Sequence, residues 1–133
     1  MKSIRSKVTR VLPFATRFNV CDNSGAKEAR LFTVYGIKTT RRRNPSARVG
    51  DLVMCNVTKG KPEMKGTVVL GVVVRQKKEY KRPNGESIKF EDNSIVVTKD
   101  NKGNPKGTVF KGPIAKEAAE RWPPVAKLAR IVV

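Results

Sequence analysis

The fold is decided by the stretch Val68-Val69-Leu70-Gly71-Val72-Val73-Val74, which is followed directly by Arg75-Gln76-Lys77-Lys78-Glu79-Tyr80-Lys81-Arg82. The first stretch is apolar, rich in β-branched valine and too short to span a membrane, so it predicts a buried strand. The second places five cations around one acid. After the turn signal Pro83-Asn84-Gly85, residues 86–90 alternate polar and apolar side chains and predict a returning strand. We therefore expect a core strand that continues into a long, basic β-hairpin.

Short strand patterns separated by turn residues fill most of the remaining chain. We expect strands at residues 18–21, 29–37, 52–58 and 95–98. Because an open sheet of such short strands would show exposed edges, the pattern predicts a small closed β-barrel in a mostly β fold class. The length of 133 residues, without an internal linker, predicts one domain over residues 1–133.

The two ends of the chain differ from this pattern. Residues 1–17 hold five basic residues and no acid, and we interpret them as a basic N-terminal arm. A short helix is expected at residues 113–122, because a proline lies near its start, strong helix formers follow, and Pro123-Pro124 would stop it. Residues 125–133 fit either a strand or a further helical turn followed by a strand.

The balance of charge limits the choice of partner. The chain has 29 Lys and Arg against 11 Asp and Glu, a formal net charge of +18. Such a charge opposes compaction unless a polyanion or salt neutralises it, so the natural partner is negative. Nucleic acid, an anionic membrane surface and an acidic protein all qualify by charge. No apolar run approaches the roughly 20 residues of a spanning helix, and residues 1–17 lack the apolar block of a signal peptide. We expect a soluble, intracellular protein with no membrane partner.

The cations gather in four segments, at residues 2–17, 38–48, 59–65 and 75–82. A single charged run is usually only a solvated face, but four runs on the loops of a β scaffold favour binding to a phosphate backbone. The candidate contacts are Lys2, Arg5, Lys7, Arg10, Arg17, Arg41, Arg42, Arg43, Arg48, Lys59, Lys61, Lys65, Arg75, Lys77, Lys78, Tyr80, Lys81 and Arg82. Binding would be mainly electrostatic.

Aromatic residues are few and do not form the paired-ring motif of an RNA-recognition sheet. Most of them sit where a core residue is expected, so we expect recognition of folded RNA by its shape and backbone. Tyr80 either stacks on RNA or covers the hairpin. Trp122 is either a core plug or a protein-interface anchor, and we favour the core.

Catalytic and metal-binding patterns are missing. The chain has no histidine, which removes the commonest general base and metal ligand. Cys21 and Cys55 have no metal-ligand spacing and are expected to be small core or sheet residues in a reducing compartment. Asp22-Asn23-Ser24-Gly25-Ala26-Lys27 lacks the Walker spacing, and Glu91-Asp92 is expected to be a turn pair or a partner for nearby cations rather than a Mg²⁺ site. We expect no enzymatic activity, metal or cofactor.

Several motifs recur together in one known family. They are Asp22-Asn23-Ser24-Gly25-Ala26-Lys27, the segment from Gly71-Val72-Val73-Val74 through Asn84-Gly85, Phe90, Asn93, Val96-Val97 and Gly112-Pro113-Ile114-Ala115-Lys116-Glu117. From about Phe18 to its C-terminus the chain resembles the universal large-subunit ribosomal protein family numbered fourteen. The stretches Val74-Arg75-Gln76-Lys77-Lys78 and Phe90-Glu91-Asp92-Asn93, with residues 117–123, are similar to its archaeal and eukaryotic branch.

The resemblance implies a five-stranded β-barrel with a projecting ribbon and small C-terminal helices. It implies a structural constituent of the large ribosomal subunit, in the cytoplasm, that binds large-subunit (23S-type) rRNA and contributes to intersubunit bridges with small-subunit rRNA. Large-subunit proteins numbered three and twenty-four e are implied as neighbours. Factors that block subunit joining would bind near the C-terminal helix, at Ile114, Lys116, Glu117, Glu120, Arg121 and Trp122. Composition alone leaves open a free nucleic-acid-packaging or chaperone protein.

Overall fold

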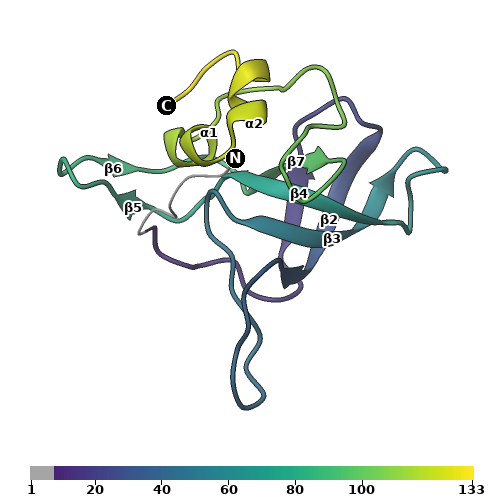
Figure 1. Cartoon of the computed structure of the whole chain (residues 1–133), viewed down its shortest axis with the longest axis horizontal. Coiled ribbons are helices and arrows are strands. Elements are labelled where there is room, and N and C mark those ends of the chain that lie inside the picture. The colour runs from purple at the N-terminus through teal and green to yellow at the C-terminus, as the bar shows by residue number, and fades with distance from the viewer. Residues whose placement is uncertain (1–7) are drawn as a thin grey trace.

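A closed barrel of five strands forms the centre of the molecule in a computed structural model that describes residues 8–133 (Figure 1). Its strands are β1 (Arg17–Val20), β2 (Ala26–Val34), β3 (Leu52–Gly60), β4 (Val68–Arg75) and β7 (Ser94–Thr98). Neighbours in the order β1-β2-β3-β4-β7 pair antiparallel, and β1 pairs in parallel with β7 to close the ring. The five-stranded barrel implied by the resemblance is therefore confirmed.

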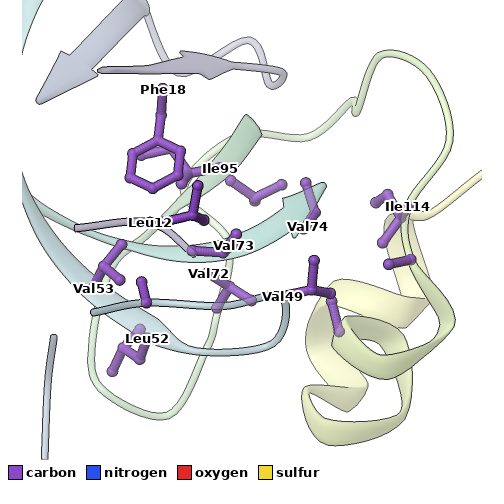
Figure 2. Packing of buried hydrophobic residues seen from close by; sticks show 14 of the residues in the cluster. Leu12, Phe18, Val49, Leu52, Val53, Val72, Val73, Val74, Ile95 and Ile114 are labelled. Atoms are coloured by element: carbon purple, nitrogen blue, oxygen red, sulfur yellow. The ribbon is translucent and has the colours of Figure 1, made fainter. Parts of the chain in front are cut away.

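Strand β4 is the most deeply buried part of the predicted hairpin unit. Val72, Val73 and Val74 are each 0% exposed. Figure 2 shows these valines between Phe18 and Ile95 of the barrel and Ile114 beside the C-terminal helices. The backbone at Ala115 donates a hydrogen bond to the Val74 carbonyl at 3.0 Å, which fixes the helical segment to the strand. A strand covered on both faces needs a continuous apolar run rather than alternation, which explains the valines.

The Asp22-Asn23-Ser24-Gly25 motif holds the barrel closed beside the β1–β7 pair. The Asp22 carboxylate is buried and accepts hydrogen bonds from Val97 N at 2.9 Å and from Ser24 Oγ at 2.6 Å. The Asn23 side-chain oxygen accepts a hydrogen bond from Thr108 N at 2.8 Å. The motif therefore joins the end of β1 to β7 and to the segment that follows β7, and its polar groups bind the protein's own backbone.

The basic hairpin projects from the barrel, but its paired part is short. Strands β5 (Tyr80–Lys81) and β6 (Ser87–Ile88) pair over two residues each, and Figure 1 shows them extending beyond the barrel. We expected β4 to run straight into this arm and the returning strand to cover residues 86–90. Instead, β4 ends at Arg75, and Gln76 is buried with its side-chain oxygen accepting a hydrogen bond from Val49 N at 3.1 Å. This anchor separates the arm from the barrel strand.

The C-terminal region contains two short helices, α1 (Lys116–Arg121) and α2 (Pro123–Leu128). Pro123 ends the first helix as expected, but it also begins the second. Proline is tolerated at the first helical position, because the backbone N–H that it lacks would have no intrahelical partner there. After α2 the chain forms a parallel bridge between Ile114 and Val132. Residues 125–133 therefore match the second alternative in its helical turn, with a single β-bridge in place of the strand. Neither helix within residues 8–133 is long and apolar enough to cross a membrane.

Several strand bounds differ from the expected ones, most clearly those of β2 and β3. Strand β2 starts earlier than the predicted 29–37, and it also ends earlier because the chain turns at Gly36 with a φ of 77°. Strand β3 continues to Gly60, beyond the predicted end at 58. A Cβ at Gly60 would lie 2.7 Å from the Gly25 carbonyl oxygen, so the close approach of the two turns requires glycine here.

Two phenylalanines of the barrel provide a matched test of the core. Phe18 is 0% exposed and Phe32 is 44% exposed. Phe18→Ala should lower the free energy of unfolding by about 3–5 kcal/mol, because it removes a fully buried ring. Phe32→Ala should change it by less than about 0.5 kcal/mol. Urea unfolding followed by circular dichroism measures both, and equal losses would contradict the placement of the core.

Candidate nucleic-acid interface

The longest projection from the barrel is the basic loop between β2 and β3, which includes residues 38–48 (Figure 1). Arg41, Arg42 and Arg43 are all exposed on it. The backbone of Arg41 has a φ of 47° and that of Arg42 a φ of 64°, a region that residues with side chains seldom occupy. At the base of the loop, Leu12 and Ala47 exchange two backbone hydrogen bonds of 3.1 and 2.8 Å. The loop thus carries three guanidinium groups on a stem fixed to the N-terminal segment.

A second basic surface lies on the turn between β3 and β4. Lys61 and Lys65 are exposed there, and the Lys61 backbone N–H donates to the Gly25 carbonyl at 2.9 Å. Lys106, from the segment after β7, places its Nζ 3.4 Å from the Met64 sulfur of the same turn. The fold therefore gathers three lysines from two distant segments at this end of the barrel.

The remaining predicted contacts before β4 are in different environments. Arg10 and Arg17 are exposed, but Arg17 lies 3.2 Å from Glu28, and Lys59 lies 3.7 Å from the other oxygen of that carboxylate. Arg48 is partly buried and donates a hydrogen bond to the Val8 carbonyl at 2.9 Å. The candidates Lys2, Arg5 and Lys7 lie outside the described residues.

Arg75, the first cation of the predicted arm, is an interior residue. It is 8% exposed, and its Nε lies 2.9 Å from Asp92 Oδ1. Its other nitrogens donate to Ser94 Oγ at 2.8 Å and to the carbonyls of Lys111 and Pro113 at 3.0 and 3.1 Å. These bonds tie β7 and the C-terminal segment to the end of β4. The guanidinium is engaged inside the protein, so we leave Arg75 out of the proposed RNA surface.

Tyr80 and Arg82 are also turned inward, and both bind Glu117 of α1. Tyr80 is 2% exposed, and its hydroxyl donates to Glu117 Oε2 at 2.8 Å. Arg82 Nε donates to Glu117 Oε1 at 2.8 Å, and its Nη2 donates to the Val133 carbonyl at 2.6 Å. A buried ring presents no face to a base in this conformation, so of the two roles considered for Tyr80 the structure supports packing within the hairpin base. We call this set of contacts the hairpin clasp.

The contacts of the clasp shift the pKa values of Glu117 and Tyr80. Burial alone would raise the pKa of Glu117, but the hydrogen bonds from Arg82 and Tyr80 outweigh it and hold that pKa below its usual value of 4.5. Burial, together with the hydrogen bond to Glu117, raises the pKa of Tyr80. The carboxylate is therefore kept ionised and the phenol neutral, which preserves both hydrogen bonds at neutral pH.

With these two arginines and Tyr80 held inside, lysines supply the charge of the arm. Lys77, Lys78 and Lys81 are exposed. Lys77 and Lys78 line a groove of about 510 Å³, together with Lys89, Val11, Leu12, Glu79 and Asn93. The groove lies between the N-terminal segment and the start of the hairpin. Its three lysines against one glutamate give it a positive charge that suits a phosphate backbone.

The residues predicted to contact proteins divide into buried and exposed sets. Ile114 and Trp122 are at most 1% exposed, and the Trp122 indole N–H donates to the Gly50 carbonyl at 2.7 Å. Arg121 is 9% exposed and donates to the same carbonyl at 3.0 Å. These three side chains anchor α1 to the barrel, which confirms the core role favoured for Trp122. Glu117 belongs to the clasp, and Lys116 and Glu120 remain exposed on α1 as candidates.

The described residues show no arrangement suited to metal binding or nucleophilic chemistry. Within residues 8–133, no three His, Cys, Asp or Glu side chains are placed to hold a metal ion. Cys21 and Cys55 are free and buried. Burial raises the pKa of the Cys21 thiol to about 11 and that of Cys55 to about 12, so both remain protonated at neutral pH.

Sequence reasoning missed several surface residues. Lys89 and Lys106 join basic surfaces only because the fold brings distant segments together, and no local pattern marks them. Five of the eight aromatic residues are buried, as we expected of most of them, whereas Phe14, Phe32 and Tyr35 are 47%, 44% and 43% exposed. Two-residue alternation along residues 29–32 could have identified Phe32 as outward-facing, because the charged Arg30 lies two positions away on the same face of a strand.

Comparison with known proteins finds relatives along nearly the whole chain. A family model described as "Ribosomal protein L14p/L23e" matches residues 11–133. A protein of Nanoarchaeum equitans named "Large ribosomal subunit protein uL14" is 52% identical over 133 residues, which cover 100% of both chains. Proteins of the same name from Methanococcus vannielii and Methanococcus maripaludis are 48% and 47% identical over 132 residues, with 99% of each chain covered.

The hairpin clasp predicts a pH-dependent contribution to stability. Glu117→Gln should lower the free energy of unfolding at neutral pH by about 1–3 kcal/mol, because buried donors lose a charged acceptor. Since the folded-state pKa of Glu117 is lowered, this contribution is fully present above the usual value of 4.5 and is lost as the pH falls through the folded-state value. Urea unfolding at a series of pH values should show the wild-type advantage shrinking in acid.

The control for this variant is Glu120→Gln, which removes the same charge from the same helix at a side chain that is 63% exposed. It should change stability by less than about 0.5 kcal/mol. If the two variants behaved alike, or if the Glu117 effect did not diminish in acid, the clasp would not stabilise the fold as described.

Proposed function

The chain belongs to the ribosomal protein L14p/L23e family, and on that premise we propose that it is a structural constituent of the large ribosomal subunit that binds the rRNA of that subunit. The observation that carries the proposal is the separation of charge. The acids Asp92 and Glu117 each bind an arginine whose side chain is mostly buried, whereas the cations of the projecting loops face solvent. A rigid barrel that holds exposed cations on separate loops is suited to following a folded phosphate backbone.

The exposed cations of the three projections are enough for strong binding. They are Arg41, Arg42, Arg43, Lys61, Lys65, Lys77, Lys78 and Lys81. If these eight side chains each neutralise a phosphate, affinity should fall by roughly three to five decades between 50 mM and 200 mM salt. Arg10, Lys89 and Lys106 add to the same field.

The finer assignments remain proposals that rest on family membership. We infer that the projecting loops also reach small-subunit rRNA at intersubunit bridges. We infer that neighbouring large-subunit proteins numbered three and twenty-four e pack beside the barrel. Lys116 and Glu120, which are exposed on α1, are the candidates for contact with factors that block subunit joining. The chain would act in the cytoplasm, within the ribosome.

Family membership also bears on catalysis. The relatives are named as large ribosomal subunit proteins, and this family is not enzymatic, so the chain is not an enzyme. Its residues are therefore expected to act by position and charge rather than by chemistry.

Replacing Arg41, Arg42 and Arg43 together with glutamine tests the role of the β2–β3 loop. The variant should bind large-subunit rRNA more weakly, and the slope of log affinity against log salt should fall in magnitude by about two to three, because three phosphate contacts are lost. Filter binding across a salt series measures both quantities. Thermal unfolding should be unchanged, since all three side chains are exposed.

A variant with the same charge change serves as the control. Lys102→Gln, Lys111→Gln and Lys127→Gln together remove three exposed cations outside the predicted contacts. This control should affect rRNA binding much less than the arginine variant. Equal effects would mean that net charge, rather than the position of the loop, determines binding, and would count against the proposed interface.

A further inference from the structure

The outer face of β1 and β2 carries exposed aromatic rings among arginines. Phe14 and Phe32 are 47% and 44% exposed. Arg17 of β1 lies directly opposite Arg30 of β2 in the antiparallel register, and both side chains are exposed. The Arg30 guanidinium carbon lies 5.6 Å from the centre of the Phe14 ring. The Arg30 guanidinium thus lies over one face of the ring and adds positive charge to it.

Phe14 is held outward by an unfavourable turn. The Thr16 backbone N–H and hydroxyl both donate to the Pro13 carbonyl, at 3.2 and 2.7 Å, which closes a four-residue turn. Ala15, the third residue of that turn, has a φ of 71°, a value for which such turns normally use glycine. Two backbone hydrogen bonds with Leu31, of 2.9 and 2.8 Å, fix the turn against β2. Strained backbone held in place by its surroundings is typical of functional sites.

Phe32 faces outward beside an irregularity in the sheet. Leu31 pairs with Cys55 and Thr33 pairs with Met54, so the register of β2 against β3 shifts at Phe32. Such a bulge increases the local twist of the strand. Phe32 also lies two positions along β2 from Arg30, which places the two outward-facing side chains on one face of the strand.

We propose that Phe14, Arg30 and Phe32 form a stacking platform for unpaired RNA bases; the proposal rests on the proposed function and adds base contacts to its phosphate contacts. The charge of the face favours RNA as the occupant. Glu28, the acid on this side of β2, is within 3.2 Å of Arg17 and Thr58 and 3.7 Å of Lys59, so its charge is offset within the protein. Exposed rings interleaved with guanidinium groups match the flat faces and negative backbone of single-stranded RNA.

Binding of the full-length chain to two defined RNAs tests the platform. The probes are a single strand of about 12 uridines and a duplex of about 12 base pairs, both fluorescently labelled. The double variant Phe14→Leu/Phe32→Leu keeps apolar bulk but removes both ring faces. Its affinity for the single strand should fall about tenfold or more, because each stacked base contributes substantially to binding. Its affinity for the duplex and its salt slope should be unchanged.

Val109→Ala is the matched control, because Val109 is an exposed apolar residue that lies elsewhere, 38% exposed in the segment after β7. It should bind both probes like the wild type. Loss of single-strand affinity in the aromatic variant alone would support the platform. If the aromatic variant kept its single-strand affinity, or lost affinity equally for both probes, the platform would be overturned. In that case duplex binding by the wild type would still support the proposed function. A wild-type chain that bound neither probe would overturn both.

Discussion

The rest of the structure depends on the parallel pairing of β1 with β7, which closes the barrel. The pairing is short, joining Asn19 with Ser94 and Val20 with Ile95. The buried Asp22 carboxylate reinforces it from the end of β1 by accepting the Val97 N–H. Without closure, both strands would present unpaired edges to solvent. Closure also fixes the positions from which the basic loops leave the barrel, so the geometry of the proposed RNA surface follows from it.

Cationic side chains that are neighbours in the sequence lie in different environments in the fold. Arg75 and Arg82 lie in the same cationic run as Lys77, Lys78 and Lys81, yet the arginines bind internal acids and carbonyls while the lysines face solvent. The planar guanidinium can satisfy several fixed acceptors at once, whereas an ammonium on a flexible stem remains well hydrated at the surface. These arginines are thus neutralised locally, and the exposed cations of the projecting loops carry uncompensated positive charge on the described surface. Self-repulsion of this kind is relieved when a polyanion binds.

The sequence predicted those features that have a local cause. The valine run predicted the buried strand β4, and the turn residues predicted where strands end. The closed barrel was predicted from the number of short strands and the cost of exposed edges. The clasp could not be predicted, because Arg82 and Glu117 are 35 residues apart and each resembles a surface charge in its own segment. A helical turn after Pro124 was one of two alternatives that periodicity left open, but its start at Pro123 was not expected, because that proline was interpreted only as a stop. The outward position of Phe14 depends on a strained turn at Ala15, which no propensity predicts.

The central claim is that the chain is an integral, stoichiometric component of the large ribosomal subunit rather than a free nucleic-acid-binding protein. Sedimentation of a tagged copy from cell extract through a salt-containing gradient, with its copy number determined per large subunit, tests this claim most directly. The account predicts one copy for each large subunit, retained through moderate salt. Release to the top of the gradient, or a large excess of the chain over subunits, would contradict it.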